Sequence, residues 1–381
     1  MRILFISERL LWENTGAEIV TKNNLNSLID IAGEENVDII TFYEEEESIK
    51  RLSKYKNVTA LKRYDNKILK FINWIKLNNG GINSENNKQV LDIINNNNYE
   101  YIFLDSSVYG KLARYIKINK PNAKIVTFFH DVSKFWSKSL IKTSKEIKGT
   151  IRLCTYHPSY VYNEAKTIQY TDYIISLNQR DAKLIEGEYK KSVNEIIPVN
   201  IKDRFLEERI NKNPKNETIE ILFVGAYYLP NVVGIKWFID NVMENINAKL
   251  IIVGKGMEAL REEINVDNVE VHGFVKDLDS YYYDADLVVA PIFDGGGMKV
   301  KIAEALMYGK TIVGTTEAFE GYDIDIEKIG YKCDDKNTFI ESIEKFISDK
   351  NLNKYNEFSR KEFLEKYEYE NCLNKMKSIF K

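Results

Sequence analysis

The chain has 381 residues, of which 44% are hydrophobic and 29% are charged, proportions that are ordinary for a globular enzyme. This length exceeds what one hydrophobic core usually serves, so two domains are expected. The net charge of −3 gives no general attraction to nucleic acid, and three widely spaced cysteines support neither a zinc ribbon nor a disulfide framework, which fits a reducing cytoplasm.

The apolar run at the N-terminus, residues 3–6, is too short for the core of a signal peptide. No stretch approaches the roughly 18 apolar residues of a membrane-spanning helix. We therefore expect a cytoplasmic protein that does not cross a membrane.

Short apolar runs alternate with longer charged segments along the whole chain. The first series predicts strands at 3–6, 37–42, 101–104, 125–129 and 173–177. A second series predicts strands at 219–224, 249–253, 269–271, 287–291 and 311–313. Runs rich in Val, Ile and Phe that are separated by helix-length stretches indicate parallel sheets with helices on both faces. Two such series predict two α/β domains.

The predicted domain boundary lies near Pro198, before an exposed Asn- and Lys-rich loop. The first domain is expected at 1–199 and the second at 200–363. An amphipathic helix at about 364–381 is expected to pack back on the first domain.

The segment 290–306 combines a strand, a glycine-rich turn and a helix start. The strand ends at Pro291, glycines 295–297 turn the chain, and a helix is predicted from about Met298. Unpaired backbone N–H groups and the positive end of a helix dipole would then point to one place, which suits a diphosphate.

Lys301 and Glu304 are three residues apart and share one face of this helix. Lys301 is expected beside the phosphates, and Glu304 is placed to accept the hydroxyl protons of a ribose. The alternative is an ordinary helix start whose Lys and Glu form an exposed pair.

From residue 219 to residue 324 the sequence resembles the retaining glycosyltransferases of family 4. Several motifs in the right order are specific, although each alone is weak. The motifs are FVG at 223–225, PNV at 230–232, IIVG at 251–254, HGFVKDL at 272–278, DLVVAP at 286–291, GGG at 295–297 and EAL at 304–306. The resemblance implies a GT-B fold: two facing Rossmann-like, doubly wound parallel-sheet domains with a C-terminal crossover helix.

In the first domain the resemblance is looser. Gly16 follows the first strand, where the family has a glycine turn, and His130 ends a strand at the position of the family's inter-domain histidine. The resemblance implies that His130 contacts the donor sugar; the alternative is a structural histidine. The catalytic candidates are His130, Lys301 and Glu304. The donor-binding candidates are Gly16, Gly225, Tyr227, Asn231, Gly254, Gly273, Phe274, Val275, Gly295, Gly296, Gly297, Met298 and Lys299.

The chain departs from the family in two places. Many members carry a Glu eight residues before the one that matches Glu304, where this chain has Gly296, a feature shared with a triple-glycine subgroup. Members with that Glu often also have an Arg and a Lys shortly after the glycine that matches Gly225, and this chain has neither. Lys299 and Lys301 are then expected to neutralise more of the diphosphate.

The resemblance implies a metal-independent retaining transfer without a cofactor. As the bond between the anomeric carbon and the diphosphate breaks, negative charge grows on the leaving group, and N–H groups and lysines can stabilise it. The implied donor is a nucleotide-diphosphate sugar, the acceptor a glycan or lipid-linked glycan, and the setting bacterial cell-surface polysaccharide or glycoconjugate synthesis. Two alternatives stay open: a non-catalytic GT-B partner subunit and a GT-B sugar-nucleotide epimerase. A nicotinamide oxidoreductase is disfavoured because no GxGxxG follows the first strand.

Asp284 and Asp286 form the DxD pattern of metal-dependent glycosyltransferases. Because Asp286 directly precedes a buried strand, we interpret it as structural and predict no metal site.

Two basic segments of the first domain suit an anionic membrane surface. Between Lys62 and Lys76 there are five basic residues and one acid, a net charge of +4, and the apolar residues fall at helical spacing. Between Lys134 and Lys148 there are five lysines with Phe135 and Trp136 among them. The interpretations left open are peripheral membrane binding and helices packed on the core with a solvated basic edge.

Overall fold

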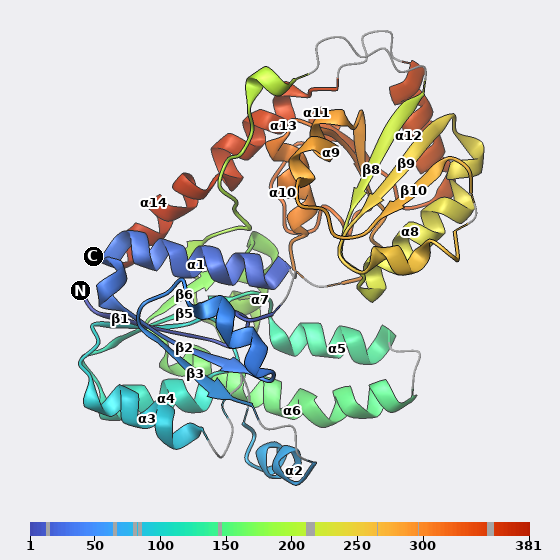
Figure 1. The fold of residues 1–381 in the computed structure, drawn as a ribbon. Coiled ribbons are helices and arrows are strands. Elements are labelled where there is room, and N and C mark those ends of the chain that lie inside the picture. The colour runs from blue at the N-terminus through green and yellow to red at the C-terminus, as the bar shows by residue number, and fades with distance from the viewer. Residues whose placement is uncertain are drawn as a thin grey trace. The chain divides into compact units, whose positions relative to one another are not determined.

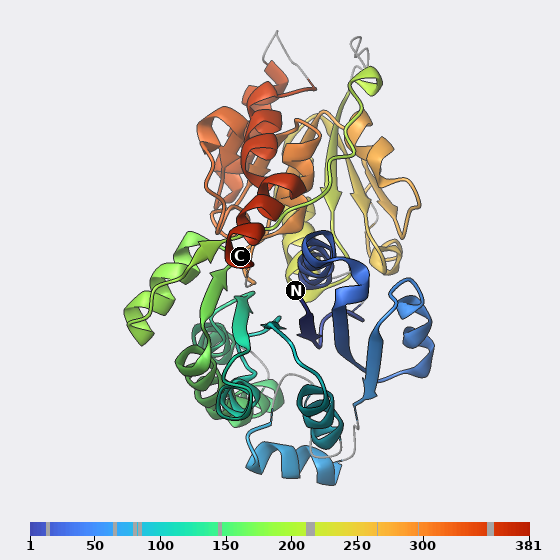
Figure 2. The same cartoon turned by 90° about the vertical axis from the view of Figure 1, so that its left-hand side faces the viewer.

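The computed structural model describes residues 1–12, 16–63, 67–78, 82, 86–143, 147–210, 218–264, 266–295, 297–348 and 354–381. Contacts within the chain divide it into two compact units, Met1–Ile197 with Leu373–Lys381, and Pro198–Cys372. Each unit holds one parallel sheet with helices around it (Figures 1 and 2). The predicted α/β class with two doubly wound domains is confirmed.

The first unit has a sheet in the order β3-β2-β1-β4-β5-β6-β7. Its strands are β1 (Ile3–Ser7), β2 (Val37–Tyr43), β3 (Val58–Lys62), β4 (Tyr101–Leu104), β5 (Lys124–Phe129), β6 (Tyr173–Ser176) and β7 (Glu195–Ile196). Its helices are α1 (Gly16–Ala32), α2 (Lys67–Ile75), α3 (Asn87–Asn96), α4 (Gly110–Asn119), α5 (Ser133–Thr143), α6 (Ile147–Tyr170) and α7 (Gln179–Tyr189).

Alternate residues of β1 and β4 face two different hydrophobic layers. Leu4 and Ile102 pack with the apolar residues of α3 and α4 in one cluster. Phe5 stacks on Phe103, and Phe103 in turn meets Phe380 near the C-terminus, with ring centroids 5.6 and 6.5 Å apart. A parallel sheet covered on both faces explains why these strands are continuous apolar runs.

The second unit has a sheet in the order β10-β9-β8-β11-β12-β13. Its strands are β8 (Ile219–Val224), β9 (Ala248–Val253), β10 (Val269–His272), β11 (Leu287–Ala290), β12 (Thr311–Gly314) and β13 (Gly330–Lys332). Its helices are α8 (Leu229–Asn241), α9 (Leu278–Asp284), α10 (Val300–Met307), α11 (Ile326–Ile329), α12 (Lys336–Ser348) and α13 (Glu357–Glu362). All ten strands predicted from the sequence are present, while β3, β7 and β13 were not predicted.

The C-terminal segment runs from α13 through a π-helical turn, Phe363–Tyr367, into α14 (Tyr369–Ile379). The contacts assign only residues 373–381 to the first unit, so the part expected to join it from about residue 364 packs instead with the second unit. One reason is backbone pairing, because the Tyr369 N–H donates to the Ile201 carbonyl at 3.1 Å. In the first unit, the Phe380 ring lies 4.8 Å from that of Tyr101.

Both sheets have a point where the strand order reverses, between β1 and β4 and between β8 and β11. Open α/β sheets bind ligands at the carboxyl ends of the strands beside such a point. The candidate site residues lie at these two edges.

Candidate functional site

Glycines follow three adjacent strands of the second sheet: Gly225 after β8, Gly254 after β9 and Gly273 after β10. The Gly254 N–H donates to the Gly273 carbonyl at 3.2 Å, and a Cβ on Gly254 would collide with the Gly225 carbonyl. A Cβ on Gly225 would lie 2.9 Å from Asn231 Nδ2 and 3.1 Å from Lys301 Nζ. The structure therefore brings Gly225, Asn231 and Lys301 together at the carboxyl edge, where a larger residue at 225 would displace the ends of these two side chains.

Lys301 lies in the first turn of α10. Its Nζ donates to Asn231 Oδ1 at 2.8 Å and lies 4.2 Å from the centroid of the Phe223 ring. Burial and, to a smaller extent, the Lys299 ammonium lower the pKa of Lys301 to about 7, against the opposing effect of Glu304. Because Asn231 offers a neutral acceptor and no counter-charge, an incoming phosphate dianion would supply a charge that suits this ammonium.

Glu304 lies one turn further along α10, and its side chain is 14% exposed. Tyr282 donates its hydroxyl to Glu304 Oε2 at 3.2 Å, and Arg204 Nη2 lies 4.0 Å from Oε1. Burial raises the pKa of Glu304, against the opposing effects of Arg204, Tyr282 and Lys301. The result is a positioned carboxylate at the same edge as Lys301.

Tyr282→Phe is expected to destabilise the protein by about 1–2 kcal/mol, because a buried carboxylate loses a hydrogen bond. It should also raise the pKa of Glu304 further. As the pH falls, Glu304 is then protonated earlier, and nucleoside diphosphate binding weakens at a higher pH than in the parent protein. Urea unfolding and UDP titrations between pH 5 and 8 measure the two effects. The control is Tyr322→Phe, which removes a bond to the Lys299 carbonyl of 2.8 Å and should leave the pH profile of binding unchanged. Identical profiles for both variants would contradict the role given to Tyr282.

The glycine turn before α10 requires glycine at two described positions. Gly295 has φ 128° and Gly297 has φ 69°, values that side chains with a Cβ rarely adopt. Gly296 lies outside the described residues. The Gly295 N–H, which the sequence assigns to a phosphate, donates to Asp294 Oδ1 at 2.7 Å in this structure. The Asp294 carboxylate therefore already accepts a hydrogen bond from this N–H.

Lys299 differs from the sequence-based expectation. Helix α10 begins at Val300 and not near Met298, so Lys299 precedes the helix. Its Nζ forms an ion pair with Glu317 Oε1 at 2.7 Å and donates to the Gly297 carbonyl. Its charge is therefore already matched by a carboxylate. The Met298 side chain is buried, which leaves only its backbone for a ligand.

The remaining donor-binding candidates of this unit lie on two loops. Tyr227 follows β8 and is 51% exposed, and Phe274 follows β10 and is 69% exposed, with Val275 beside it. Exposed rings at the carboxyl edge suit stacking on a nucleobase. Gly16 belongs to the first unit, where it begins α1 directly after residues 13–15, which lie outside the described residues.

His130 takes part in a buried polar cluster at the reversal point of the first sheet. Its Nε2 lies 3.0 Å from Asp105 Oδ1, which also accepts from Asn24 Nδ2 at 3.0 Å. The hydroxyls of Ser7 and Thr21 donate to Asp105 Oδ2 at 2.8 and 2.6 Å. His130 is 7% exposed and Asp105 is fully buried. Four donors around one carboxylate hold the imidazole in a fixed orientation.

Burial alone would raise the pKa of Asp105, but His130, Arg9 and Thr21 outweigh it, and the pKa lies below its usual value. An ionised Asp105 accepts from the ring and thereby favours the His130 tautomer with its proton on Nε2. Asp105 was missed in the sequence, although it follows a buried strand just as His130 does. Tyr282, Arg204 and Glu317 were missed because no local pattern marks them.

The DxD pattern has a structural role at Asp286. Its Oδ1 forms an ion pair with Lys354 at 3.1 Å, and its Oδ2 accepts from the Glu220 N–H at 2.7 Å. In the described part of the chain, no group of three or more His, Cys, Asp or Glu side chains is arranged to hold a metal ion.

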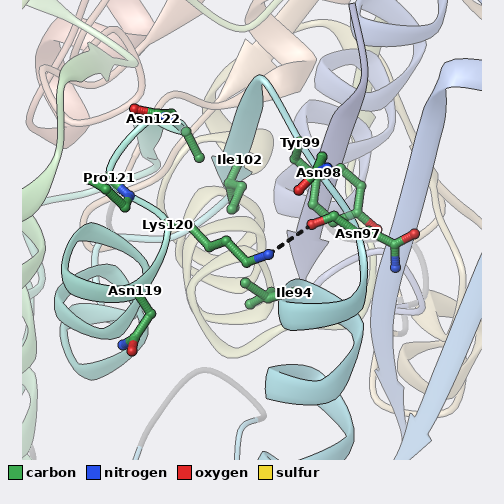
Figure 3. Close-up of a pocket in the computed structure, with 10 residues that line it drawn as sticks. Ile94, Asn97, Asn98, Tyr99, Ile102, Asn119, Lys120, Pro121 and Asn122 are labelled. Carbon is green, nitrogen blue, oxygen red and sulfur yellow. Dashed lines mark hydrogen bonds between the residues drawn. The ribbon is translucent and has the colours of Figure 1, made fainter.

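A hollow of about 380 Å³ lies at the opposite, amino edge of the first sheet, between the ends of α3 and α4 and the starts of β4 and β5 (Figure 3). Lys120 donates its Nζ to the carbonyls of Asn95 and Asn97 at 2.7 and 3.2 Å. A lysine that binds the last carbonyls of a helix stabilises the helix end. We therefore interpret this hollow as structural.

Residues 218–349 match the family model described as "Glycosyl transferases group 1". A curated relative, an "uncharacterized 44.6 kDa protein in cps region" of Klebsiella pneumoniae, is 27% identical over 116 residues, 26% of this chain. The chain spans only 30% of that relative's length.

Among solved structures, sucrose-phosphate synthase from Thermosynechococcus elongatus is similar, with a TM-score of 0.71, 14% identity, and coverage of 100% of this chain and 98% of that one. The Anabaena protein HepE in complex with UDP gives a TM-score of 0.69 and 14% identity, covering 100% and 99% of the two chains. HepE is also known in complex with UDP-glucose. The likeness over the whole chain confirms the GT-B fold that the motifs implied.

Proposed function

We propose that this chain is a retaining glycosyltransferase that moves a hexose-type sugar from a nucleotide diphosphate donor to a glycan or lipid-linked glycan acceptor. The observation that carries the proposal is the partly buried Lys301 ammonium beside Gly225, with the Glu304 carboxylate one turn away at the same sheet edge. A cation and a carboxylate so placed match the two ends of a ribose diphosphate. The group 1 domain and the UDP and UDP-glucose complexes of HepE support a nucleotide-sugar donor.

In this proposal the diphosphate lies beside Lys301 and the strand-end glycines. Negative charge grows on the leaving phosphate as the anomeric bond breaks, so a buried ammonium stabilises the transition state more than the ground state. The acceptor hydroxyl attacks from the face that the diphosphate leaves, and its proton passes to the leaving phosphate oxygen. Lys301 balances this charge without a metal or a cofactor.

Two further roles belong to the proposal. Glu304 accepts hydrogen bonds from the ribose hydroxyls, and His130 binds a hydroxyl of the transferred sugar. The setting in bacterial surface polysaccharide synthesis rests on the Klebsiella relative, which is named for the cps region. The location is the cytoplasm.

The test combines a ligand panel with one substitution. UDP-, GDP-, ADP- and CDP-sugars are compared by thermal shift, since a ligand that binds only the folded protein raises the melting temperature. Glu304→Gln is then expected to lower both that shift and the release of nucleoside diphosphate, by roughly 10–100-fold in binding, as for a charged hydrogen bond. Glu327→Gln, at an exposed position on α11, is the matched control.

Near-normal turnover in Glu304→Gln would remove this site from the proposal. A donor that binds without any hydrolysis or transfer would favour the non-catalytic partner subunit, and interconversion of the sugar without an acceptor would favour the epimerase.

A further inference from the structure

Helix α2, Lys67–Ile75, lies at the periphery of the first unit in both views (Figures 1 and 2). It is fixed there by Trp74, whose Nε1 donates to the Thr155 carbonyl of α6 at 2.9 Å. The Trp74 ring also lies 5.7 Å from that of Phe71. Trp74 therefore holds the helix against α6 by one of its faces.

Besides Trp74, which is 39% exposed, three large apolar side chains of α2 are exposed. Ile68 is 68%, Phe71 is 58% and Ile75 is 60% exposed. They are three, four and seven residues apart, so they lie on one face of the helix. The sequence left open whether α2 packs on the core, and for these three residues that interpretation is wrong. Exposed apolar residues grouped in this way mark an interaction surface.

The charge around this face is positive. The segment from 62 to 76 has five basic residues and one acid, and α2 itself carries Lys67 and Lys70 and no acid. Lys62 and Arg63 lie near Glu46 and Glu8, each at 3.5 Å. The side chains of Lys67 and Lys70 lie outside the described residues, so the positive charge of the helix is taken from the sequence alone. An apolar stripe flanked by lysines is the pattern of a helix that lies in a membrane interface.

The second basic segment, residues 134–148, does not show this pattern of exposed apolar residues flanked by lysines. Phe135 packs against the hydrophobic cluster that contains Val132 and Ile168, and the Trp136 ring meets that of Tyr160 at 6.0 Å. Lys134 forms an ion pair with Glu188. Lys145 lies outside the described residues, as do the side chains of Lys142 and Lys148. The aromatic residues of α5 are therefore packed inside the unit, unlike those of α2.

We infer that α2 docks the protein on an anionic lipid surface, with Ile68, Phe71 and Ile75 inserted between headgroups and the lysines of the segment against lipid phosphates. No helix in the described ranges is long and apolar enough to cross a membrane, so this would be surface binding. A second copy of the chain is a poorer occupant, because it would bring two segments of +4 together. The inference does not rest on the proposed reaction, since it requires no donor.

The experiment is cosedimentation of the full chain with vesicles of phosphatidylcholine alone or with about one-third phosphatidylglycerol, at low and high salt. Binding is expected only to the anionic vesicles and is expected to weaken at high salt. Phe71→Ser/Ile75→Ser should lower the partition coefficient at least tenfold, and Lys67→Glu/Lys70→Glu should do the same. Circular dichroism and UDP thermal shifts of both variants show that the fold and the second unit are intact.

Ile118→Ser is the matched control, because α4 is also basic, with Lys111, Arg114 and Lys117, but Ile118, 61% exposed, is its single exposed large apolar side chain among the described residues. It should bind vesicles as the parent does. Absence of binding to anionic vesicles, or equal binding by all variants, overturns the inference. A concentration-dependent dimer that Phe71→Ser/Ile75→Ser abolishes, without vesicle binding by the parent, overturns it in favour of self-association.

Discussion

Replacement of Lys301 by Met is expected to stabilise the unliganded protein and at the same time to lower sugar transfer by roughly 10²–10³-fold. Both effects have one physical origin. The ammonium is buried beside a neutral amide and an aromatic ring, so its charge is poorly solvated until a diphosphate arrives. Methionine fills a similar volume without a charge. The variant would bind nucleoside diphosphate weakly and leave the departing phosphate without its nearest cation.

The stability effect depends on pH in a defined direction. The pKa of Lys301 is about 7 in the folded protein and 10.5 in the unfolded chain. Between these two pH values the unfolded chain therefore binds more protons than the folded protein. Stability therefore rises with pH in this window, and the cost of the buried charge is fully present below pH 7. The gain from Lys301→Met should be on the order of a few kcal/mol at pH 6 and should vanish above about pH 10.5.

Urea unfolding at pH 6, 8 and 10 measures how the difference in stability between the parent and Lys301→Met shrinks as the pH rises. Lys332→Met on β13 is the control, because Lys332 is exposed and its removal should change neither stability nor turnover. Diphosphate binding should also raise the pKa of Lys301, which calorimetry in two buffers at pH 8 would detect as proton uptake by the parent alone. A Lys301→Met protein that is less stable at pH 6, or that transfers sugar normally, would contradict this account of the site.

The strands were predictable because buried parallel strands are continuous apolar runs. β3 and β13 were not, because both are short edge strands, with one buried residue in β3 and none in β13. The segment Val58–Lys62 has a single buried side chain, Leu61, which gives too little hydrophobic signal to be recognised.

The motifs located the strand-end glycines, Lys301 and Glu304. They did not predict the partners, the burial or the pKa of the two charged side chains. Lys299 is matched by Glu317, 18 residues further along the chain, whereas Lys301 meets the amide of Asn231, 70 residues earlier. The partners of Glu304 come from α9 and from the segment before residue 205. Pairings between distant segments leave no local pattern in one sequence, so burial and pKa had to come from the structure.

Asp105→Asn is expected to lower the kcat of transfer by roughly 10²-fold or more, without changing the UDP thermal shift. The hydroxyls of Ser7 and Thr21 beside Oδ2 can turn to accept from an amide NH₂, but Asn24 Nδ2 and the protonated His130 Nε2 beside Oδ1 cannot. If the amide nitrogen faces His130, the imidazole loses its acceptor and the proton moves to Nδ1. A positioning residue for His130 would thus act on kcat while the affinity for UDP, which lacks the sugar, stays constant.

Asp105→Asn is also expected to change the stability of the protein, by an amount that depends on pH. The pKa of Asp105 is lowered in the folded protein, so its contribution is present above the unfolded pKa and is lost as the pH falls through the folded value. The stability difference between the parent and Asp105→Asn should therefore be a few kcal/mol at pH 7 and shrink below about pH 4.

Asp38→Asn separates a positioning role from a structural one. Asp38 on β2 accepts from the Tyr99 hydroxyl at 2.8 Å and pairs with Arg2 at 2.9 Å, but it has no contact with His130 among the described hydrogen bonds. Both variants should lose stability, while only Asp105→Asn should shift the imidazole ¹⁵N resonances of His130, which are assignable in a chain with 3 histidines. If Asp105→Asn unfolds more easily yet keeps the parent tautomer and kcat, the cluster serves folding alone. His130 would then have no part in the reaction that its orientation suggests.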